Sequence, residues 1–526
     1  MVRHFRRHAL ALLPFVVFSS VAQAEEPDSE MQGLPPKAVQ QKNPAQQRYG
    51  LPKNPVVGGA VDTDLSKPLT LERAVRIGLA LQNSIALSQT QLEGANARLV
   101  QSRSQYFPQI QPRIQYNTNL QPGGVINFGG NLIRSGSSSE VFSSGLNATY
   151  NIWDTGIREN NVGSSRRSAF ASAYSLANQR QSVILSVTQS YYTLNRARGL
   201  VKAQNNSVVR AQANLDIVQA AANAGTAAKS DTLQAEADLA NAQVNLLSAQ
   251  NDLNVAQANL KNAMGVVSGD ILNTPEDNLP IPSYDGDTRT VDHYVKLAYS
   301  NRYDIKQQQE LVYSQGYQVK TAILQNGLSV NASITQGYAL EPNKGENRTF
   351  TVTFNYPLFD GGNSRAVIRE SKAQYEQQKR TLDQLEQNVS LSVEQSWLIR
   401  ELGRKRVNAA QTAIRAARLN YEVAQERQKN GLTNVLELIT AQVQLTNAEN
   451  SFIQALYDYY IADAQLQRNV GVNDPEYAPK VPGAKPIRSS SLVPTWAQST
   501  TVFDMPTKPE SHSLFEQSLS DTGRKF

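Results

Sequence analysis

The sequence contains no cysteine. Disulfide bonds, thiolate metal sites, cysteine nucleophiles and the acylated N-terminal cysteine of a lipoprotein are therefore excluded. Histidine is almost as rare, because two of the four histidines precede residue 10, which leaves His293 and His512. The sequence also lacks the short motifs of zinc proteases, phosphate-binding loops and serine hydrolases. We therefore expect no enzyme, no metal site and no cofactor.

Long apolar runs are missing as well. Beyond residue 24, no stretch reaches the ~18 apolar residues of a membrane-spanning helix. Residues 1–24 have the pattern of a secretory signal, with a basic start, an apolar stretch over Ala9–Val21 and a cleavage motif at Ala22–Ala24. The mature chain is then expected to begin near Glu25, and any membrane crossing must use β-strands.

The net charge is small. It is +6 for the whole sequence, and removal of Arg3, Arg6 and Arg7 with the signal leaves +3. So small a charge on a chain of 526 residues does not favour binding to nucleic acid.

The chain contains one unit twice. The residues that recur 206 positions later include Tyr150, Trp153, Asp154, Gly156 and Gly225, which return as Tyr356, Phe359, Asp360, Gly362 and Gly431. Further upstream the spacing is 218, from Leu79, Ala80 and Asn83 to Leu297, Ala298 and Asn301. The larger upstream spacing predicts an insertion in the first copy, which we place in the glycine- and serine-rich stretch 123–139.

Each copy predicts a helix, two strands, a long helix, a turn and a closing helix. The expected helices cover 70–106, 157–224 and 231–264 in the first copy, and 291–325, 363–430 and 434–470 in the second. A long helix of this size extends about 100 Å and requires a coiled coil or a helical barrel. The first and closing helices together match the long one, which predicts that they stack end to end.

The expected strands alternate apolar and polar residues, as in Phe350–Tyr356, over about ten residues each. A soluble sandwich gives the same alternation. The signal, the repeat and the long helices favour membrane strands here. Since four strands cannot close a barrel, the chain must oligomerise, and two, three or four copies all remain open.

Over Leu69–Val472 the chain resembles the TolC-type outer-membrane factor family. The resemblance depends on the tandem repeat, on Tyr150–Gly156 and Tyr356–Gly362, and on the two helix-turn-helix ends. It implies a mainly α protein with membrane β: a homotrimer with a twelve-stranded β-barrel, four strands per chain, continuous with a twelve-helix periplasmic α-barrel. The implied place is the outer membrane, in contact with its lipid.

The same resemblance implies a passive exit duct of a tripartite multidrug efflux pump or a type I secretion system. Its partners would be a periplasmic adaptor and an inner-membrane pump. A periplasmic coiled-coil adaptor or a structural protein is the alternative that the long helices leave open.

The resemblance also implies that function concentrates at the two helix turns. The predicted gate residues are Asp231 and Glu437, with Ser230 and Thr440 beside them, and the predicted adaptor contacts are Gly225, Thr226, Ala227, Gly431, Leu432 and Thr433. Each acid also falls in the first turn of a helix, where it stabilises the helix dipole without any gating role. Where some family members lock the closed tip with an aromatic residue and an arginine, this chain has Gln428 and Thr433.

The expected organisation is therefore linear. The predicted segments are the signal 1–24, a proline- and glutamine-rich extension 25–68, the first repeat 69–270, a linker 271–287, the second repeat 288–472 and a C-terminal tail 473–526.

Overall fold

The computed structural model describes residues 68–128, 131–266, 274–275, 279–282, 289–341, 345–430, 432–474 and 477, without the side chains at 119–140 and 339–341. The predicted signal, nearly all of both terminal extensions and most of the linker lie outside the described residues. Among the described helices, none combines the length and the apolar character needed to cross a membrane.

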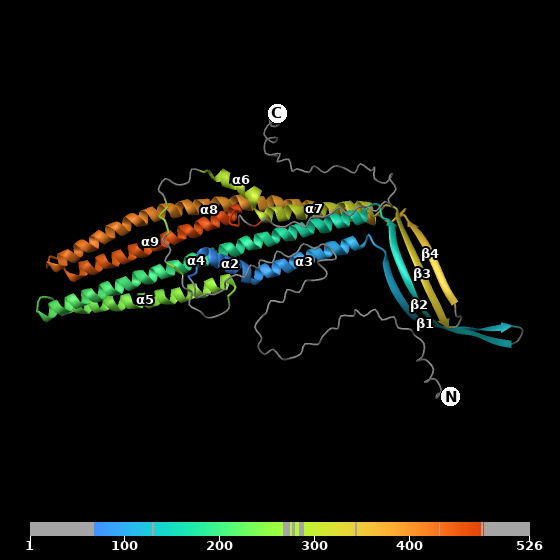
Figure 1. The fold of residues 1–526 in the computed structure, drawn as a ribbon, viewed down its shortest axis with the longest axis horizontal. Helices are drawn as coiled ribbons and strands as arrows, with labels where there is room; N and C mark the ends of the chain where they lie inside the picture. The colour runs from blue at the N-terminus through green and yellow to red at the C-terminus, as the bar shows by residue number, and fades with distance from the viewer. Residues whose placement is uncertain are drawn as a thin grey trace, which may run out of the picture. The chain divides into compact units, whose positions relative to one another are not determined.

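The described elements follow the predicted order twice (Figure 1). In the first repeat these are α2 (Leu71–Leu81), α3 (Asn83–Ser104), β1 (Gln109–Phe128), β2 (Asn131–Trp153), α4 (Ile157–Asn223) and α5 (Lys229–Met264). In the second they are α6 (Val291–Asn301), α7 (Tyr303–Leu324), β3 (Ser329–Glu341), β4 (Gly345–Asn355), α8 (Asn363–Lys429) and α9 (Val435–Val470). Both long helices have 67 residues and end within one residue of the predicted position.

The four strands form one antiparallel sheet in the order β1-β2-β3-β4. Its register separates the two kinds of side chain into rows. Ile110, Ala148, Ile334 and Phe350 lie opposite one another across the sheet, and the neighbouring row on the other face is Gln111, Asn147, Thr335 and Thr349. One face is therefore apolar and the other polar, as the alternation predicts. The apolar side chains are largely exposed, with Ile110 at 66% and Phe350 at 67%.

The strands of the first hairpin are much longer than the strands predicted. β1 has 20 residues and β2 has 23, against 13 and 11 for β3 and β4. The two strands remain paired through the predicted insertion, with one irregularity in register between Gln121 and Gly124. The insertion therefore lengthens the hairpin instead of forming a separate loop.

The short helices stack end to end against the long one, as predicted. Both α3 and α5 pack on α4, and α7 and α9 both pack on α8. The Gln82 amide, at the start of α3, donates to the carbonyl oxygens of Asn262 (3.3 Å) and Ala263 (3.2 Å) at the end of α5. The start of one short helix therefore meets the end of the other.

The prediction of one continuous first helix is wrong in both repeats. Gln82 is extended (φ −69°, ψ 118°) and separates α2 from α3, and Arg302 separates α6 from α7 in the same way. Gly265, just past the end of α5, lies so close to Leu81 that α2 cannot continue along the line of α3. α2 instead turns aside and buries Ile77 against a core that includes Tyr191, Leu194, Leu260 and Met264.

The helix bounds also correct the repeat spacing. α3 begins at Asn83 and α7 at Tyr303, so the spacing of equivalent helices upstream of the sheet is 220 and not 218. The correct alignment matches Ile85 with Ile305, both of them buried. Since the downstream spacing stays at 206, the insertion in the first repeat is slightly longer than predicted.

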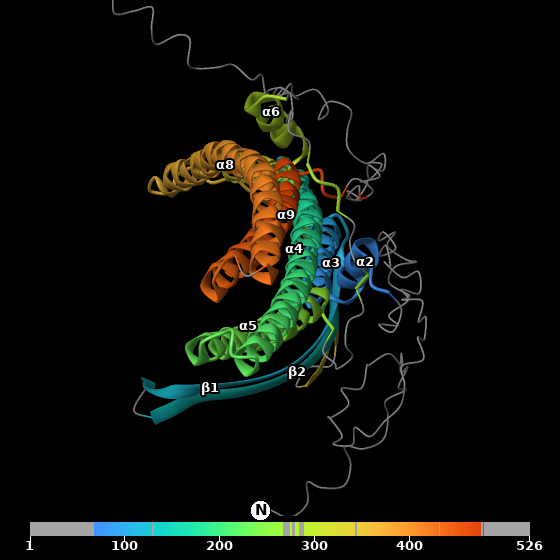
Figure 2. The same ribbon diagram turned by 90° about the vertical axis from the view of Figure 1, so that its left-hand side faces the viewer.

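The two long helices differ in how much the chain itself covers them. α4 contacts α2, α3, α5, α7 and α9 and is buried along most of its length. On α8 the buried residues are Val389, Val393, Ser396, Val407 and Ala424. Figure 2 shows α8 at the edge of the layer and α4 within it. A large side of α8 is thus left uncovered by the described residues.

Candidate functional site at the two helix turns

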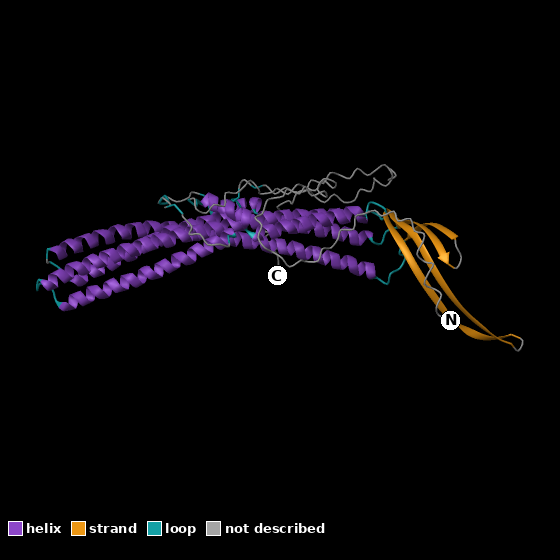
Figure 3. Ribbon diagram, turned by 60° about the horizontal axis from the view of Figure 1, so that its bottom comes forward, coloured by secondary structure: helices purple, strands orange, loops and turns teal. Residues whose placement is uncertain are grey.

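The α4–α5 turn and the α8–α9 turn both lie at the helix ends remote from the sheet (Figures 1 and 3). In the first turn, the Gly225 N–H donates to Ala222 O (3.0 Å) and the Thr226 N–H to Ala221 O (2.9 Å). This pair of bonds is a Schellman closure, and it places Gly225 at φ +76°. Gly225 thus ends the long helix in the left-handed region, which glycine tolerates.

The second turn closes with a similar bond, from the Leu432 N–H to Arg427 O at 2.8 Å. Gly431 lies outside the described residues. The Asn434 side chain accepts a hydrogen bond from the Glu437 N–H at 3.0 Å and caps α9. The turn is therefore fixed from both sides, by backbone at the end of α8 and by a side chain at the start of α9.

The Glu437 carboxylate bridges this second turn. Its Oε1 accepts from the Arg427 guanidinium at 2.7 Å, and the Thr433 hydroxyl donates to its other oxygen. Arg427 is 49% and Glu437 45% exposed, so the ion pair is open to solvent and individually weak. The sequence analysis did not identify Arg427 or Asn434 as site residues. Arg427 could have been found as a basic residue near the end of the predicted long helix, and Asn434 from its N-x-x-E spacing to Glu437.

The other predicted gate residues make only local bonds. Asp231 lies in the first turn of α5, and within the described part of the chain its carboxylate accepts only from the Ser230 hydroxyl, at 3.4 Å. Thr440 donates back to Leu436 O, inside α9. No described hydrogen bond or ion pair joins Asp231 to Glu437. Both acids are in first turns as predicted, and among the described contacts neither carboxylate accepts a hydrogen bond from a backbone N–H there.

The predicted adaptor contacts that the structure describes differ in exposure. Thr226 is exposed, and its hydroxyl donates to Ala221 O at 2.9 Å. Ala227 is half-buried. Leu432 is 69% exposed. Thr433 is half-buried, and its hydroxyl donates a hydrogen bond to the Glu437 carboxylate.

Behind the turns, a row of polar contacts joins the α4/α5 pair to the α8/α9 pair. We call it the polar seam. Its contacts are Gln428 to Asn214 (3.4 Å), Gln442 to Asp238 (3.0 Å), Thr446 to Ser207 (3.2 Å), Arg210 to Thr446 (3.1 Å) and Arg210 to Glu449 (3.1 Å). Gln442 is only 1% exposed and Asn214 3%. The seam therefore joins the two helix pairs behind the turns through polar groups, some of them almost fully buried.

Asp238 makes the seam sensitive to pH. Burial raises the pKa of the Asp238 carboxyl, and the hydrogen bond from Gln442 opposes part of this rise. The folded chain thus keeps this proton to a higher pH than the unfolded chain, so stability falls as pH rises through the folded pKa.

We expect Asp238→Asn to melt at a higher temperature than the unmodified protein at neutral pH, because it removes a partly buried charge. The difference in melting temperature between the two proteins should become smaller at lower pH, where Asp238 itself becomes protonated. Thermal unfolding in detergent at several pH values measures this difference. A difference in melting temperature that does not change with pH would contradict the raised pKa of Asp238.

The model of the outer membrane efflux protein family matches residues 77–266 and 295–472, which is most of both repeats. The chain belongs to the outer membrane efflux protein family. Among characterised relatives, the outer membrane efflux protein BepC of Brucella suis is 24% identical over 339 residues, covering 62% of this chain and 71% of BepC.

Solved structures confirm the fold. The Campylobacter jejuni outer membrane channel CmeC superimposes with a TM-score of 0.63 at 20% identity, covering 77% of this chain and 86% of CmeC. The Vibrio cholerae outer membrane protein VceC superimposes with a TM-score of 0.64 at 16% identity, covering 76% of this chain and 96% of VceC. A membrane protein from Pseudomonas aeruginosa superimposes with a TM-score of 0.66 at 19% identity, covering 76% of this chain and 93% of that protein.

The predicted TolC-type fold and family resemblance are therefore confirmed. The protein is a passive outer-membrane exit channel of efflux pumps, with a long periplasmic extension, and not an enzyme. Family membership implies a trimeric channel that works with efflux pump partners. The alternative of an adaptor or a structural coiled coil is thereby set aside.

Proposed function

We propose that the two helix turns form the periplasmic gate of this channel and the surface that a periplasmic adaptor contacts. The observation that carries the gate is the Arg427–Glu437 pair, which links the last turn of α8 to the first turn of α9. In a trimer each turn occurs three times around one axis, and three Asp231 and three Glu437 carboxylates would surround a narrow mouth. Rings of this kind set the electrostatic barrier of a pore.

Two kinds of contact would stabilise the closed state. The exposed Arg427–Glu437 pair fixes the shape of the second turn, and the buried polar seam fixes its distance from the first. An opening motion would have to separate seam contacts, each of which leaves a buried polar group without its partner. Opening would therefore need work from outside the chain, which a docked adaptor and pump could supply.

The docking surface is the outer side of the same turns. Leu432 and Leu436 are 69% and 59% exposed. Thr433 follows Leu432 in the second turn, and Thr226 is exposed on the first turn. Exposed apolar side chains with polar neighbours are typical of a contact surface. We propose a periplasmic adaptor as its partner and an inner-membrane pump as the next member of the assembly, in either a multidrug efflux or a type I secretion system.

The barrel in this proposal is closed by three copies. The apolar row of the sheet would face outer-membrane lipid, and the polar row would face the lumen. The edge strands β1 and β4 have no strand partner on their outer sides in the described chain, and pairing β4 of one copy with β1 of the next would complete the ring.

The gate is tested by replacing both acids, Asp231→Ala with Glu437→Ala. We expect the resting conductance in planar lipid bilayers to rise by roughly tenfold, since ~0.5 kcal/mol lost in each of three copies shifts the closed state by about that factor.

Glu426→Ala is the matched control. It also removes an exposed carboxylate near the second turn, one paired with Lys429 on α8 (2.7 Å), but it leaves the Glu437 bridge in place. Its conductance should match that of the unmodified protein. If the resting conductance rises equally in both variants, net charge and not the Glu437 bridge controls conductance. If the conductance rises in neither variant, Asp231 and Glu437 act only at their helix ends.

A further inference from the structure

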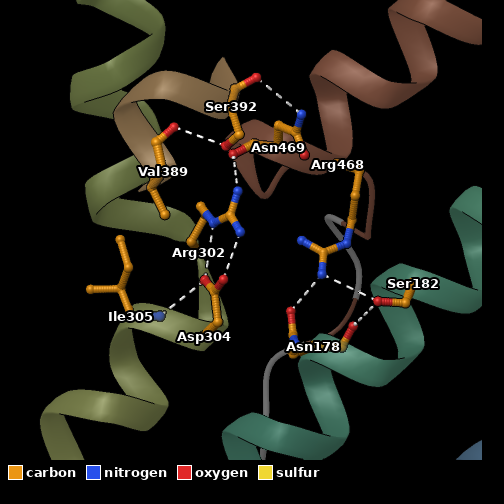
Figure 4. A network of polar contacts seen from close by, with 9 residues as sticks. All are labelled: Asn178, Ser182, Arg302, Asp304, Ile305, Val389, Ser392, Arg468 and Asn469. Atoms are coloured by element: carbon orange, nitrogen blue, oxygen red, sulfur yellow. Dashed lines mark hydrogen bonds and ion pairs between the residues drawn. The ribbon is translucent and has the colours of Figure 1, made fainter. Parts of the chain in front are cut away.

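The break between α6 and α7 is built around one arginine (Figure 4). The Arg302 guanidinium forms a two-point pair with Asp304, with distances of 3.0 Å (Nε–Oδ1) and 2.6 Å (Nη2–Oδ2). Its remaining nitrogen, Nη1, donates to Asn469 O at 3.0 Å, in the last turn of α9. Arg302 therefore binds the end of one helix and a carboxylate at the start of the next.

Both charges lie where helix dipoles favour them. Asp304 is in the first turn of α7, and its Oδ1 also accepts from the Ile305 N–H at 3.0 Å. Arg302 lies against the carbonyl end of α9. A negative charge stabilises a helix start and a positive charge a helix end. The pair thus joins α9 to α7 at the point where they stack.

The same cluster ties this junction to the other two helices. Arg468 Nη2, in the last turn of α9, donates to Asn178 Oδ1 (2.6 Å) and Ser182 Oγ (3.2 Å) on α4. The Asn469 amide donates to Ser392 O (3.3 Å) and Ser396 Oγ (3.2 Å) on α8. Four helices are thereby connected at one level, as Figure 4 shows for most of these contacts.

The cluster is largely shielded from water, because the side chains of Arg302 and Asp304 are only 11% and 20% exposed. Burial acts to raise the pKa of Asp304, but the hydrogen bond and charge of Arg302, with the charge of Arg468, hold that pKa below its usual value. The carboxylate is therefore ionised at neutral pH, and the pair remains charged.

The first repeat builds the equivalent junction without charge. Gln82 stands at the place of Arg302 and makes the same contact, from its amide to the last-turn carbonyls of α5. By the upstream spacing Ser84 stands at the place of Asp304, and by the downstream spacing Asn262 stands at the place of Arg468. The chain thus has one neutral junction and one charged junction in the same architecture.

We propose that the Arg302–Asp304–Arg468 cluster is a fixed pin, which holds the α8/α9 pair at its resting angle to α4, and that the neutral first-repeat junction is the more compliant of the two. The inference depends on the proposed gate, because the pin acts on the pore by positioning the second turn. Loosening the pin should let the α8/α9 turn move, although the pin lies far along the helices from that turn.

The test replaces the Arg302–Asp304 pair of the pin with the residues of the first repeat, in the double variant Arg302→Gln with Asp304→Ser, and leaves Arg468 in place. Gln82 and Ser84 show that the fold accepts these residues at this place, and net charge does not change. We expect amide exchange at the start of α7 and the end of α9 to become about tenfold faster. We also expect resting conductance in planar bilayers to rise several-fold.

The matched control is Arg380→Gln with Asp383→Ser, which removes an exposed pair on α8 (80% and 54% exposed). Neither readout should change in the control. Unchanged exchange at the junction in the test variant would overturn the pin itself. Faster exchange with unchanged conductance would overturn the action of the pin on the pore. The gate at the turns is tested separately, by the Asp231 and Glu437 variant.

Discussion

Replacing Gly145 by alanine should prevent the protein from assembling in the outer membrane. Gly145 of β2 lies opposite Gly337 of β3 in the sheet register. A Cβ at Gly145 would lie 2.4 Å from Gln336 O and 2.8 Å from the Gly337 Cα, which are backbone atoms that cannot move without breaking the ladder. β2 and β3 join the hairpin of the first repeat to that of the second. We therefore expect loss of the folded trimer.

Gly337→Ala is the control for this prediction. A Cβ there would meet Ser144 O at 3.5 Å, which is an ordinary contact. Semi-native gel electrophoresis of outer-membrane fractions should show trimer for Gly337→Ala at normal levels and almost none for Gly145→Ala. Equal trimer in both variants would show that β2 and β3 do not approach as closely as the structure has them.

The second large effect is expected at Arg210, in the polar seam. Arg210 donates to Glu449 and to Thr446, and the side chains of Arg210 and Glu449 are only 16% and 14% exposed. Arg210→Ala would leave the Glu449 carboxylate largely buried without its partner, which costs about 3 kcal/mol or more in such pairs. Urea unfolding of the solubilised protein measures this loss.

A double-mutant cycle separates the pair from the packing. Because Arg210→Ala with Glu449→Ala removes both charges, we expect the double variant to recover a large part of the stability lost in Arg210→Ala. If the two single effects simply add, the ion pair contributes nothing and the loss comes from the arginine's packing alone.

The sequence was sufficient for the elements whose signals are local. The long helices over 157–224 and 363–430 were predicted almost to the residue, because helical spacing continues without proline and Gly225 marks one end. The alternation in the strands predicted one apolar and one polar face. Both features depend on side chains a few positions apart.

The helix breaks at Gln82 and Arg302 could not be predicted in this way. Neither position is a proline or a glycine, and the helical pattern continues across both. The breaks follow from the ends of α5 and α9, which occupy the path that a continuous helix would take. The repeat spacing of 218 was read from identical residue types, Leu79, Ala80 and Asn83. The helix bounds, with the burial of Ile85 and Ile305, show that equivalent positions are 220 residues apart.

The candidate site was predicted in part. Asp231 and Glu437 were placed correctly in the first turns of α5 and α9. The partners of Glu437 in the turn, Arg427 and Asn434, had local signals that were not used. The contact of Gln442 with Asp238 joins helices of different repeats, far apart in the sequence, where no local pattern reports it. The gate itself remains a proposal.

Cryo-electron microscopy of the protein purified from outer membranes would locate the narrowest point of the channel. We expect a threefold cylinder whose narrowest point lies at the level of Asp231 and Glu437, with Arg427 paired to Glu437 in every copy. A resting structure that is wide open at these residues and constricted at the sheet or at the Arg302 junction would contradict the gate.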